Sequence, residues 1–228
     1  MPDIKIAAHD GGSFTGYLAK PAKQKAPGLV LIQEIFGVNG VMRHIADDYA
    51  KQGYLVLCPD LFWRQEPGIQ ITDAEMEKAF GYYQKFDSAK GVGDLIASVK
   101  TLRDHADGNG QVGCLGFCLG GSLAYVMAAN SDVDCSVSYY GIGIAGMLEM
   151  APAIKKPLLM HIAEEDSFVP KTEQATIKQT LAGNKLVTIH NYPGIGHAFA
   201  RVGGQPYDKK TADLANQRSA DFLKANLG

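Results

Sequence analysis

Three side chains suited to nucleophilic catalysis follow three separate apolar segments of this chain. Cys118 lies in the glycine-rich stretch GFCLGG, Asp166 follows the apolar run PLLMHIA, and His197 lies in the segment NYPGIGHAF. A thiol, an imidazole and a carboxylate can act as a triad, in which the histidine takes the proton of the thiol and the carboxylate orients the imidazole. Nucleophile, acid and histidine also follow one another in one of the known chain orders of such triads.

The surroundings of Cys118 favour a nucleophile over a packed thiol. A tight strand-to-helix turn needs neighbours without side chains, and Gly116 and Gly120 provide them. The turn would place Cys118 at a helix N-terminus, whose partial positive charge favours a thiolate. The alternative is an inert core residue, because free cysteine is among the most buried residue types.

Asp166 and His197 each have an ordinary alternative interpretation. Asp166 could belong to a solvated acidic turn and cap the helix that Pro170 opens. His197, on a glycine-flanked loop, could be a surface residue. We favour a triad because all three residues follow predicted strands in the expected order, and ligands of parallel sheets bind beyond the carboxyl ends of the strands.

Apolar segments of strand length alternate with segments that permit helices, which predicts a parallel sheet covered on both faces. A capping-box spacing at Thr72 and Glu75 precedes an amphipathic stretch, which we expect Gly91 and Gly93 to interrupt before a second helical repeat that ends near Leu102. The predicted strands are 14–18, 28–33, one within 54–62 that Pro59 stops, 111–117, 134–139, 157–163 and 186–192, and the other predicted helices are 41–52, 119–129, 170–182 and 211–225.

Length and composition favour one domain over residues 1–228, since 228 residues with 46% hydrophobic content suit a single α/β domain. The net charge of −2, with acids and bases interspersed, argues against a nucleic-acid partner. No leader pattern or membrane-length apolar run is evident, so we expect a cytoplasmic protein without a membrane partner, and a monomer by default. The four cysteines lack metal-ligand spacing and no dinucleotide motif is found, so we expect no metal and no cofactor.

Six short segments form a distinctive pattern in order along the chain: QEIFGVNG (33–40), CPDLFWRQEPG (58–68), GVGDL (91–95), GFCLGG (116–121), YYGIG (139–143) and GHAFAR (196–201). Together they resemble the dienelactone hydrolase family (carboxymethylenebutenolidases). The resemblance implies an α/β-hydrolase fold, with a mostly parallel central sheet and helices on both faces, and a cysteine where most such hydrolases use serine.

The resemblance assigns further roles to residues outside the triad. The backbone N–H groups of Ile35 and Leu119 would form the oxyanion hole, and Glu34 would take the proton from Cys118 once an anionic substrate competes for Arg201. A carboxylate near a thiol disfavours the thiolate by like-charge repulsion, which would protect the sulfur from oxidation in the empty enzyme. The alternative for Glu34 is a carboxylate held by a helix N-terminus or an arginine, and the alternative for Arg201 is a surface residue.

One position departs from the family pattern. The family's second substrate-binding arginine falls at Met76 here, and this chain has no arginine between Arg64 and Arg103. Loss of a bidentate guanidinium weakens carboxylate recognition and leaves apolar space. We expect four aromatic residues to line the pocket with Met76, although aromatic residues at such spacings are more often core: Phe36, Phe80, Tyr83 and Tyr139.

The sequence therefore favours a cofactor-free hydrolase of small lactones or activated esters that works through a thioester acyl-enzyme on Cys118. One alternative keeps the triad but takes less polar substrates, as an esterase or thioesterase. A second, of another class, is a non-catalytic ligand-binding or redox-sensing protein in which Cys118 is the oxidisable group.

Overall fold

The computed structural model describes residues 3–228, which divide into two compact units. The first unit ends at Cys114 and the second comprises Leu115–Gly228. Strand β5 (Gly108–Phe117) begins in the first unit and ends in the second.

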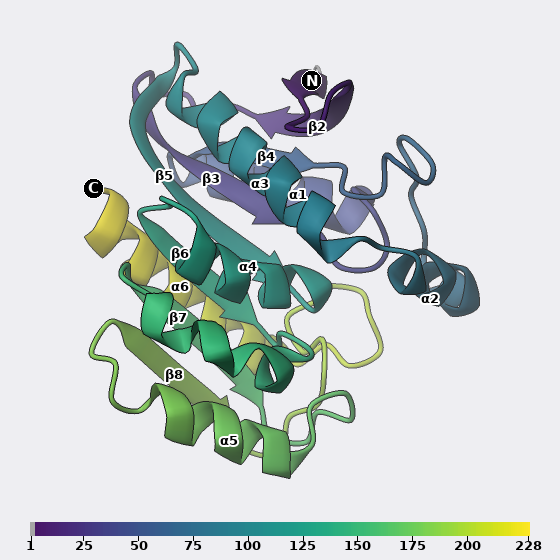
Figure 1. Cartoon of the computed structure of the whole chain (residues 1–228), viewed down its shortest axis with the longest axis vertical. Coiled ribbons are helices and arrows are strands. Elements are labelled where there is room, and N and C mark those ends of the chain that lie inside the picture. The colour runs from purple at the N-terminus through teal and green to yellow at the C-terminus, as the bar shows by residue number, and fades with distance from the viewer. Residues whose placement is uncertain (1–2) are drawn as a thin grey trace. The chain divides into compact units, whose positions relative to one another are not determined.

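The first unit carries a mixed sheet in the order β1-β2-β4-β3 (Figure 1). Strands β3 and β4 are parallel and nearly fully buried, because α1 packs on β4 and α3 packs on both strands. β2 runs antiparallel to both β1 and β4. The elements of the first unit are β1 (Asp3–Ala7), β2 (Ser13–Ala19), β3 (Ala26–Ile32), α1 (Gly40–Lys51), β4 (Leu55–Pro59), the 3-10 turn η1 (Asp73–Glu75), α2 (Met76–Gln84) and α3 (Ser88–Arg103).

Helix α3 runs without a break through Gly91 and Gly93, so the predicted interruption at these glycines was wrong. A Cβ at Gly91 would lie 2.3 Å from the ring of Phe86, and one at Gly93 would lie 2.2 Å from the ring of His9. The two glycines therefore allow close packing against the helix and do not end it. The capping box at Thr72 and Glu75 is confirmed, with Glu75 Oε2 accepting from the backbone N–H of Thr72 at 3.1 Å.

The second unit carries three parallel strands in the order β6-β7-β8, with Tyr139 beside His161 and His161 beside His190. Helices α4 and α5 lie in front of these strands in Figure 1 and α6 lies behind them, so both faces are covered. The elements are α4 (Leu119–Asn130), β6 (Cys135–Tyr139), the 3-10 segment η2 (Ile144–Ala153), β7 (Leu158–Ala163), α5 (Lys171–Leu181), β8 (Val187–Tyr192) and α6 (Lys209–Leu227).

A buried polar network joins β6, β7 and β8 to α6. His161 Nδ1 lies 2.8 Å from the hydroxyl of Tyr192, and its Nε2 lies 2.9 Å from Ser219 Oγ. The Tyr139 hydroxyl lies 2.7 Å from the same Ser219 oxygen and donates to Asn216 Oδ1 at 2.9 Å. Burial lowers the pKa of His161 well below 6.5, with smaller contributions from nearby charged groups. The ring is therefore neutral in the folded protein at neutral pH.

The sequence analysis did not anticipate β1 or η2. β1 is a five-residue edge strand, and η2 is a 3-10 segment that contains Pro152 and lacks a side-chain cap. Over the described residues, no helix combines the length and hydropathy that crossing a membrane requires.

Candidate active site

Cys118 forms the whole turn between β5 and α4, because the strand ends at Phe117 and the helix begins at Leu119. Its backbone angles are φ 55° and ψ −114°, in a region that residues with a Cβ rarely adopt. The backbone N–H of Cys118 donates to Tyr139 O at 3.1 Å, and its carbonyl accepts from Ser122 N at 3.1 Å. Such strain costs on the order of 1–3 kcal/mol and clusters at functional sites.

Two glycines make this turn sterically possible. A Cβ at Gly116 would lie 2.1 Å from the carbonyl oxygen of Gly120, and a Cβ at Gly121 would lie 2.4 Å from the carbonyl oxygen of Tyr139. Both distances are far below any normal contact. The predicted need for glycine at 116 is therefore confirmed, and the structure adds Gly121.

Among the four cysteines, Cys118 alone retains solvent exposure. Its relative exposure is 8%, whereas Cys58, Cys114 and Cys135 are each at 0%. Burial also raises the pKa of the Cys58 thiol, which keeps that sulfur protonated and unreactive. An inert core cysteine would need neither the strained turn nor the residual opening seen at Cys118.

Asp166 and His197 form a close, largely buried pair. His197 Nδ1 lies 2.7 Å from Asp166 Oδ2, and the Asp166 side chain is only 1% exposed. The other carboxylate oxygen accepts from the backbone N–H of Phe168 at 2.9 Å. Asp166 does not cap α5, because Pro170 occupies the N-cap position without a side-chain bond. A carboxylate on Nδ1 leaves Nε2 of the imidazole as the nitrogen that can exchange protons with a substrate.

The neighbouring carboxylates have structural roles. Glu165 Oε1 accepts from Lys171 Nζ at 2.7 Å, and Glu164 Oε2 accepts weakly from Gly194 N at 3.4 Å. The backbone N–H of Glu165 donates to Ile195 O at 2.8 Å. The bonds to Gly194 and Ile195 tie the turn after β7 to the loop that carries His197, and the bond to Lys171 ties it to the start of α5.

Two aromatic rings flank His197, and the sequence analysis named neither as a site residue. Tyr140 lies edge-on at a centroid distance of 5.0 Å and Phe168 at 4.8 Å. Tyr140 is buried and has a φ of 37°, whereas Phe168 is 47% exposed. Tyr140 directly follows β6, and Phe168 lies two residues after Asp166. These positions in the chain could have identified both as site residues.

Tyr139 was predicted to line a substrate pocket, and the structure contradicts this. Its side chain is fully buried and its hydroxyl bonds to Asn216 and Ser219 of α6. The difference arises where the strand ends, because Tyr139 is the last residue of β6 and Tyr140 follows it with a positive φ of 37°, which redirects the chain. Tyr140, the next residue, is the one beside His197.

Leu119 and Arg201 belong to the same unit as the triad residues. Leu119 is the first residue of α4, so its backbone N–H is among the helix N-terminal donors without an intrahelical acceptor. Arg201 follows the loop of His197, and its N–H donates to Ala198 O at 3.0 Å. A Cβ at Gly204 would lie 2.8 Å from Arg201 Nε, so this guanidinium rests against a glycine.

Three predicted residues lie on the loop that follows β3 in the first unit. Glu34, Ile35 and Phe36 are all buried. The side-chain amide of Gln33 donates to Glu34 O at 3.2 Å, and its Oε1 accepts from Leu61 N at 3.1 Å. The backbone at Glu34 is therefore fixed by a buried side chain from the same loop.

The remaining predicted residues lie on α2. Met76 is the first residue of this helix and is 36% exposed, while Phe80 and Tyr83 are partly buried. Lys78 lies 3.9 Å from Glu75 in a surface ion pair. This lysine is paired with its own helix end, so it does not replace the missing guanidinium at position 76.

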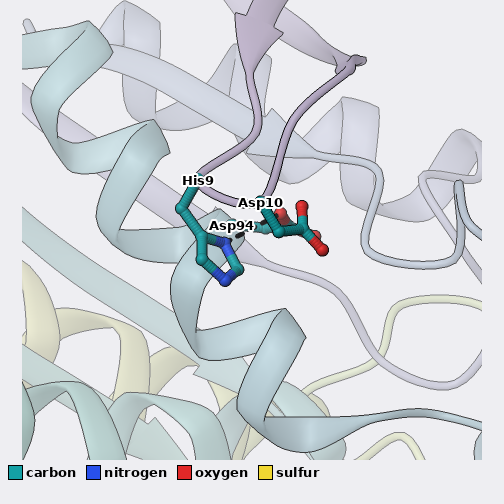
Figure 2. Close-up of side chains that lie close together, drawn as sticks. All are labelled: His9, Asp10 and Asp94. Carbon is teal, nitrogen blue, oxygen red and sulfur yellow. Dashed lines mark ion pairs between the residues drawn. The ribbon is translucent and has the colours of Figure 1, made fainter.

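Among residues 3–228, one group of His and acidic side chains lies close enough to share an ion: His9, Asp10 and Asp94 (Figure 2). Arg64 already donates to both carboxylates, at 2.6 Å to Asp10 and 3.1 Å to Asp94 Oδ1. Trp63 Nε1 also donates to Asp94, at 2.9 Å. A metal ion would have to displace the guanidinium, so this cluster joins the β1–β2 turn to α3.

A sequence model described as the dienelactone hydrolase family matches residues 14–227. The chain belongs to this family. A curated relative from Azospirillum brasilense is 50% identical over 233 residues and covers 100% of both chains. The carboxymethylenebutenolidase of Pseudomonas putida is 41% identical over 223 residues, which cover 96% of this chain and 94% of the relative.

The solved structures share the fold of this chain. A crystal structure from Klebsiella pneumoniae matches with a TM-score of 0.88 at 24% identity, covering 98% of this chain and 97% of the other. The predicted α/β-hydrolase fold and the predicted resemblance are confirmed. The protein is a dienelactone hydrolase-like enzyme that acts on carboxylic ester bonds.

Proposed function

We propose that Cys118, His197 and Asp166 form a catalytic triad that hydrolyses small lactones or activated esters through a thioester intermediate. The observation that carries this proposal is the left-handed backbone of Cys118 at the junction of β5 and α4. The bond between His197 and Asp166 in the same unit supports it.

The reaction proceeds in two steps. The Cys118 thiolate attacks the carbonyl carbon, the carbon–oxygen bond to the leaving group breaks, and the leaving oxygen takes up the proton that the thiol gave to Glu34. The acyl group is then held as a thioester on sulfur. His197 Nε2 removes a proton from water, the hydroxide displaces the sulfur, and the thiol is regenerated with release of the acid.

Two backbone donors would stabilise the oxyanion that forms in each step. We propose Leu119 N–H, at the start of α4, and Ile35 N–H, on the loop after β3. Removal of one such donor typically costs about 3 kcal/mol of transition-state stabilisation. No metal or cofactor takes part in the proposed steps.

Glu34 is the proposed proton acceptor for the Cys118 thiol, and Arg201 is the proposed partner of a substrate carboxylate. Glu34 is a buried carboxylate, a group that is costly to keep charged without a partner. In this proposal an anionic substrate draws Arg201 away from Glu34, and the freed carboxylate takes the thiol proton. Cys118 would then become nucleophilic only when substrate is bound.

The substrate class follows from the relatives and from position 76. The curated relatives named carboxymethylenebutenolidase suggest an enol lactone, whose stabilised leaving group suits a sulfur nucleophile. The exposed Met76 at the start of α2 favours a second candidate, an esterase or thioesterase for less polar substrates. Phe36, Phe80 and Tyr83 are proposed to contact the substrate in either case.

The test is hydrolysis of p-nitrophenyl acetate and of a dienelactone by the wild type, by Cys118→Ala and by Cys135→Ala. We expect Cys118→Ala to abolish turnover of both substrates and Cys135→Ala, at a buried cysteine of β6, to keep it. Mass spectrometry after an acid quench should find the acyl group on the Cys118 peptide. Full turnover by Cys118→Ala would refute the triad, and peroxide sensitivity without any turnover would favour the redox-sensor alternative.

We also propose that residues 1–228 act as one hydrolase domain and as a monomer. One cooperative unfolding transition and a light-scattering mass near 24.5 kDa are the expected results.

A further inference from the structure

Gln174 lies in the first turn of α5 with its side chain almost completely buried. Its backbone N–H donates to Pro170 O at 3.0 Å, as expected within a helix. Helical side chains point back toward the N-terminus of their helix, so the Gln174 amide reaches the segment that precedes α5. That segment is the turn 164–169, which carries Asp166.

The Gln174 amide nitrogen lies within hydrogen-bond distance of three backbone carbonyl oxygens. Nε2 lies 3.1 Å from Ala163 O, 3.1 Å from Glu164 O and 2.8 Å from Val169 O. Ala163 is the last residue of β7, and Val169 is the last residue of the turn. One side chain therefore joins both ends of the turn that carries Asp166.

The chemistry of these contacts fixes the orientation of the amide. All three partners are carbonyl oxygens, which only accept, so the NH₂ group must face them. A flipped amide would place an oxygen against three oxygens. The position therefore requires a donor of this length, and neither a carboxylate nor an apolar side chain of equal size supplies one.

We propose that Gln174 is a positioning residue that holds Asp166 in place to orient His197. Asp166 sits midway along the turn and bonds to His197 Nδ1 at 2.7 Å. The same turn is linked to the His197 loop through Glu165 N and Ile195 O. Loss of the amide leaves buried carbonyls without this donor, and the turn relaxes toward water.

This inference rests on the proposed triad, and it concerns the Asp166–His197 pair of that triad. A small displacement of an orienting group costs up to about 100-fold in rate. Gln174 touches neither substrate nor sulfur in this proposal. Its effect should therefore appear in kcat and leave KM nearly unchanged.

The test compares Gln174→Met and Gln174→Glu with two variants on the same helix. Met keeps the length without a donor, and Glu keeps the shape without the amide. Gln179→Met makes the same chemical change at an exposed position. Leu181→Ala removes buried apolar volume at the other end of α5 and controls for lost stability.

Two measurements are made on each variant, at a temperature where all are folded. The first is kcat and KM for p-nitrophenyl acetate, with Cys118→Ala as the inactive reference. The second is the downfield proton NMR resonance of the hydrogen-bonded His197 Nδ1–H, assigned by its absence in His197→Ala. The second reports the Asp166–His197 bond whether or not Cys118 is the nucleophile.

We expect both Gln174 variants to lower kcat about 10- to 100-fold with KM within about twofold. The Nδ1–H resonance should shift upfield or broaden in both Gln174 variants. The controls Gln179→Met and Leu181→Ala should keep the wild-type kcat and the wild-type resonance. A Gln174→Met enzyme with wild-type kcat and an unchanged resonance would overturn the proposal, even if its melting temperature falls as far as that of Leu181→Ala. If Cys118→Ala stays active while the resonance responds to Gln174, the triad proposal fails and the positioning role stands.

Discussion

Asp166 and His197, 31 residues apart in the chain, meet at 2.7 Å, while the adjacent Glu165 bonds to Lys171 and does not contact the imidazole. The turn after β7 therefore places Asp166, and not the adjacent Glu165, beside the His197 imidazole. The selected group is buried, whereas the Glu165 side chain is exposed. A buried carboxylate bonded to an imidazole can stabilise its cationic form far better than an exposed one.

Asp166→Asn should lower kcat by about 10³- to 10⁴-fold, because an amide at this position favours the wrong tautomer of His197. Glu165→Gln is the matched control, since it makes the same change one residue earlier at an exposed site. Steady-state hydrolysis of p-nitrophenyl acetate measures both. Equal activities of the two variants would show that Asp166 does not orient the histidine.

Iodoacetamide should modify Cys118 alone among the four thiols of the native protein, because Cys58, Cys114 and Cys135 are fully buried. Peptide mapping after timed quenching gives the rate at each site. If Glu34 acts as proposed, an anionic substrate analogue that leaves the sulfur accessible should accelerate the alkylation of Cys118. Alkylation that is equally fast with and without the analogue would contradict the proposed activation.

Met76→Arg should raise kcat/KM for lactones that carry a carboxylate and leave neutral lactones unchanged. The side chain is 36% exposed at the start of α2, so the larger residue fits without repacking the core. Gln84→Arg adds the same charge at the exposed end of the same helix and serves as the control. The interpretation of position 76 is wrong if both variants change the carboxylate preference alike.

The protein should lose stability as the pH falls below about 6.5, partly because His161 is buried in its neutral form. Burial lowers its folded pKa well below 6.5, so between the two pKa values the unfolded chain binds a proton that the folded chain does not. This contributes up to about 1.4 kcal/mol per pH unit to the slope of the unfolding free energy. Urea unfolding at pH 7, 6 and 5 measures the slope, which should be shallower in His161→Gln. Parallel slopes for the two proteins would contradict this account.

Gly116→Ala should destabilise the protein by about 3 kcal/mol, the upper end of ordinary overpacking, since a Cβ there would lie 2.1 Å from Gly120 O in the backbone. Gly146→Ala is the control, because a Cβ at that glycine meets nothing within 4 Å. Urea unfolding of both variants gives the comparison. A near-wild-type Gly116→Ala protein would mean that the turn at Cys118 relaxes easily.

The sequence by itself determined the order of the elements and the chain positions of the candidate triad. Continuous apolar runs predicted the buried parallel strands, because a strand covered on both faces has no polar side, and residues after such strands must meet at one edge. The edge strand β1 and the 3-10 segment η2 were not predicted, since five residues and a run with Pro152 carry little periodicity.

Only the tertiary structure decided how individual side chains are used. It showed that Gly91 and Gly93 lie within a helix, and that Tyr140 and not Tyr139 lies beside His197. It also selected Asp166 from three consecutive acids. These outcomes depend on contacts between residues far apart in the chain, which local pattern does not encode, whereas strand and helix periodicity arises from neighbours a few residues apart.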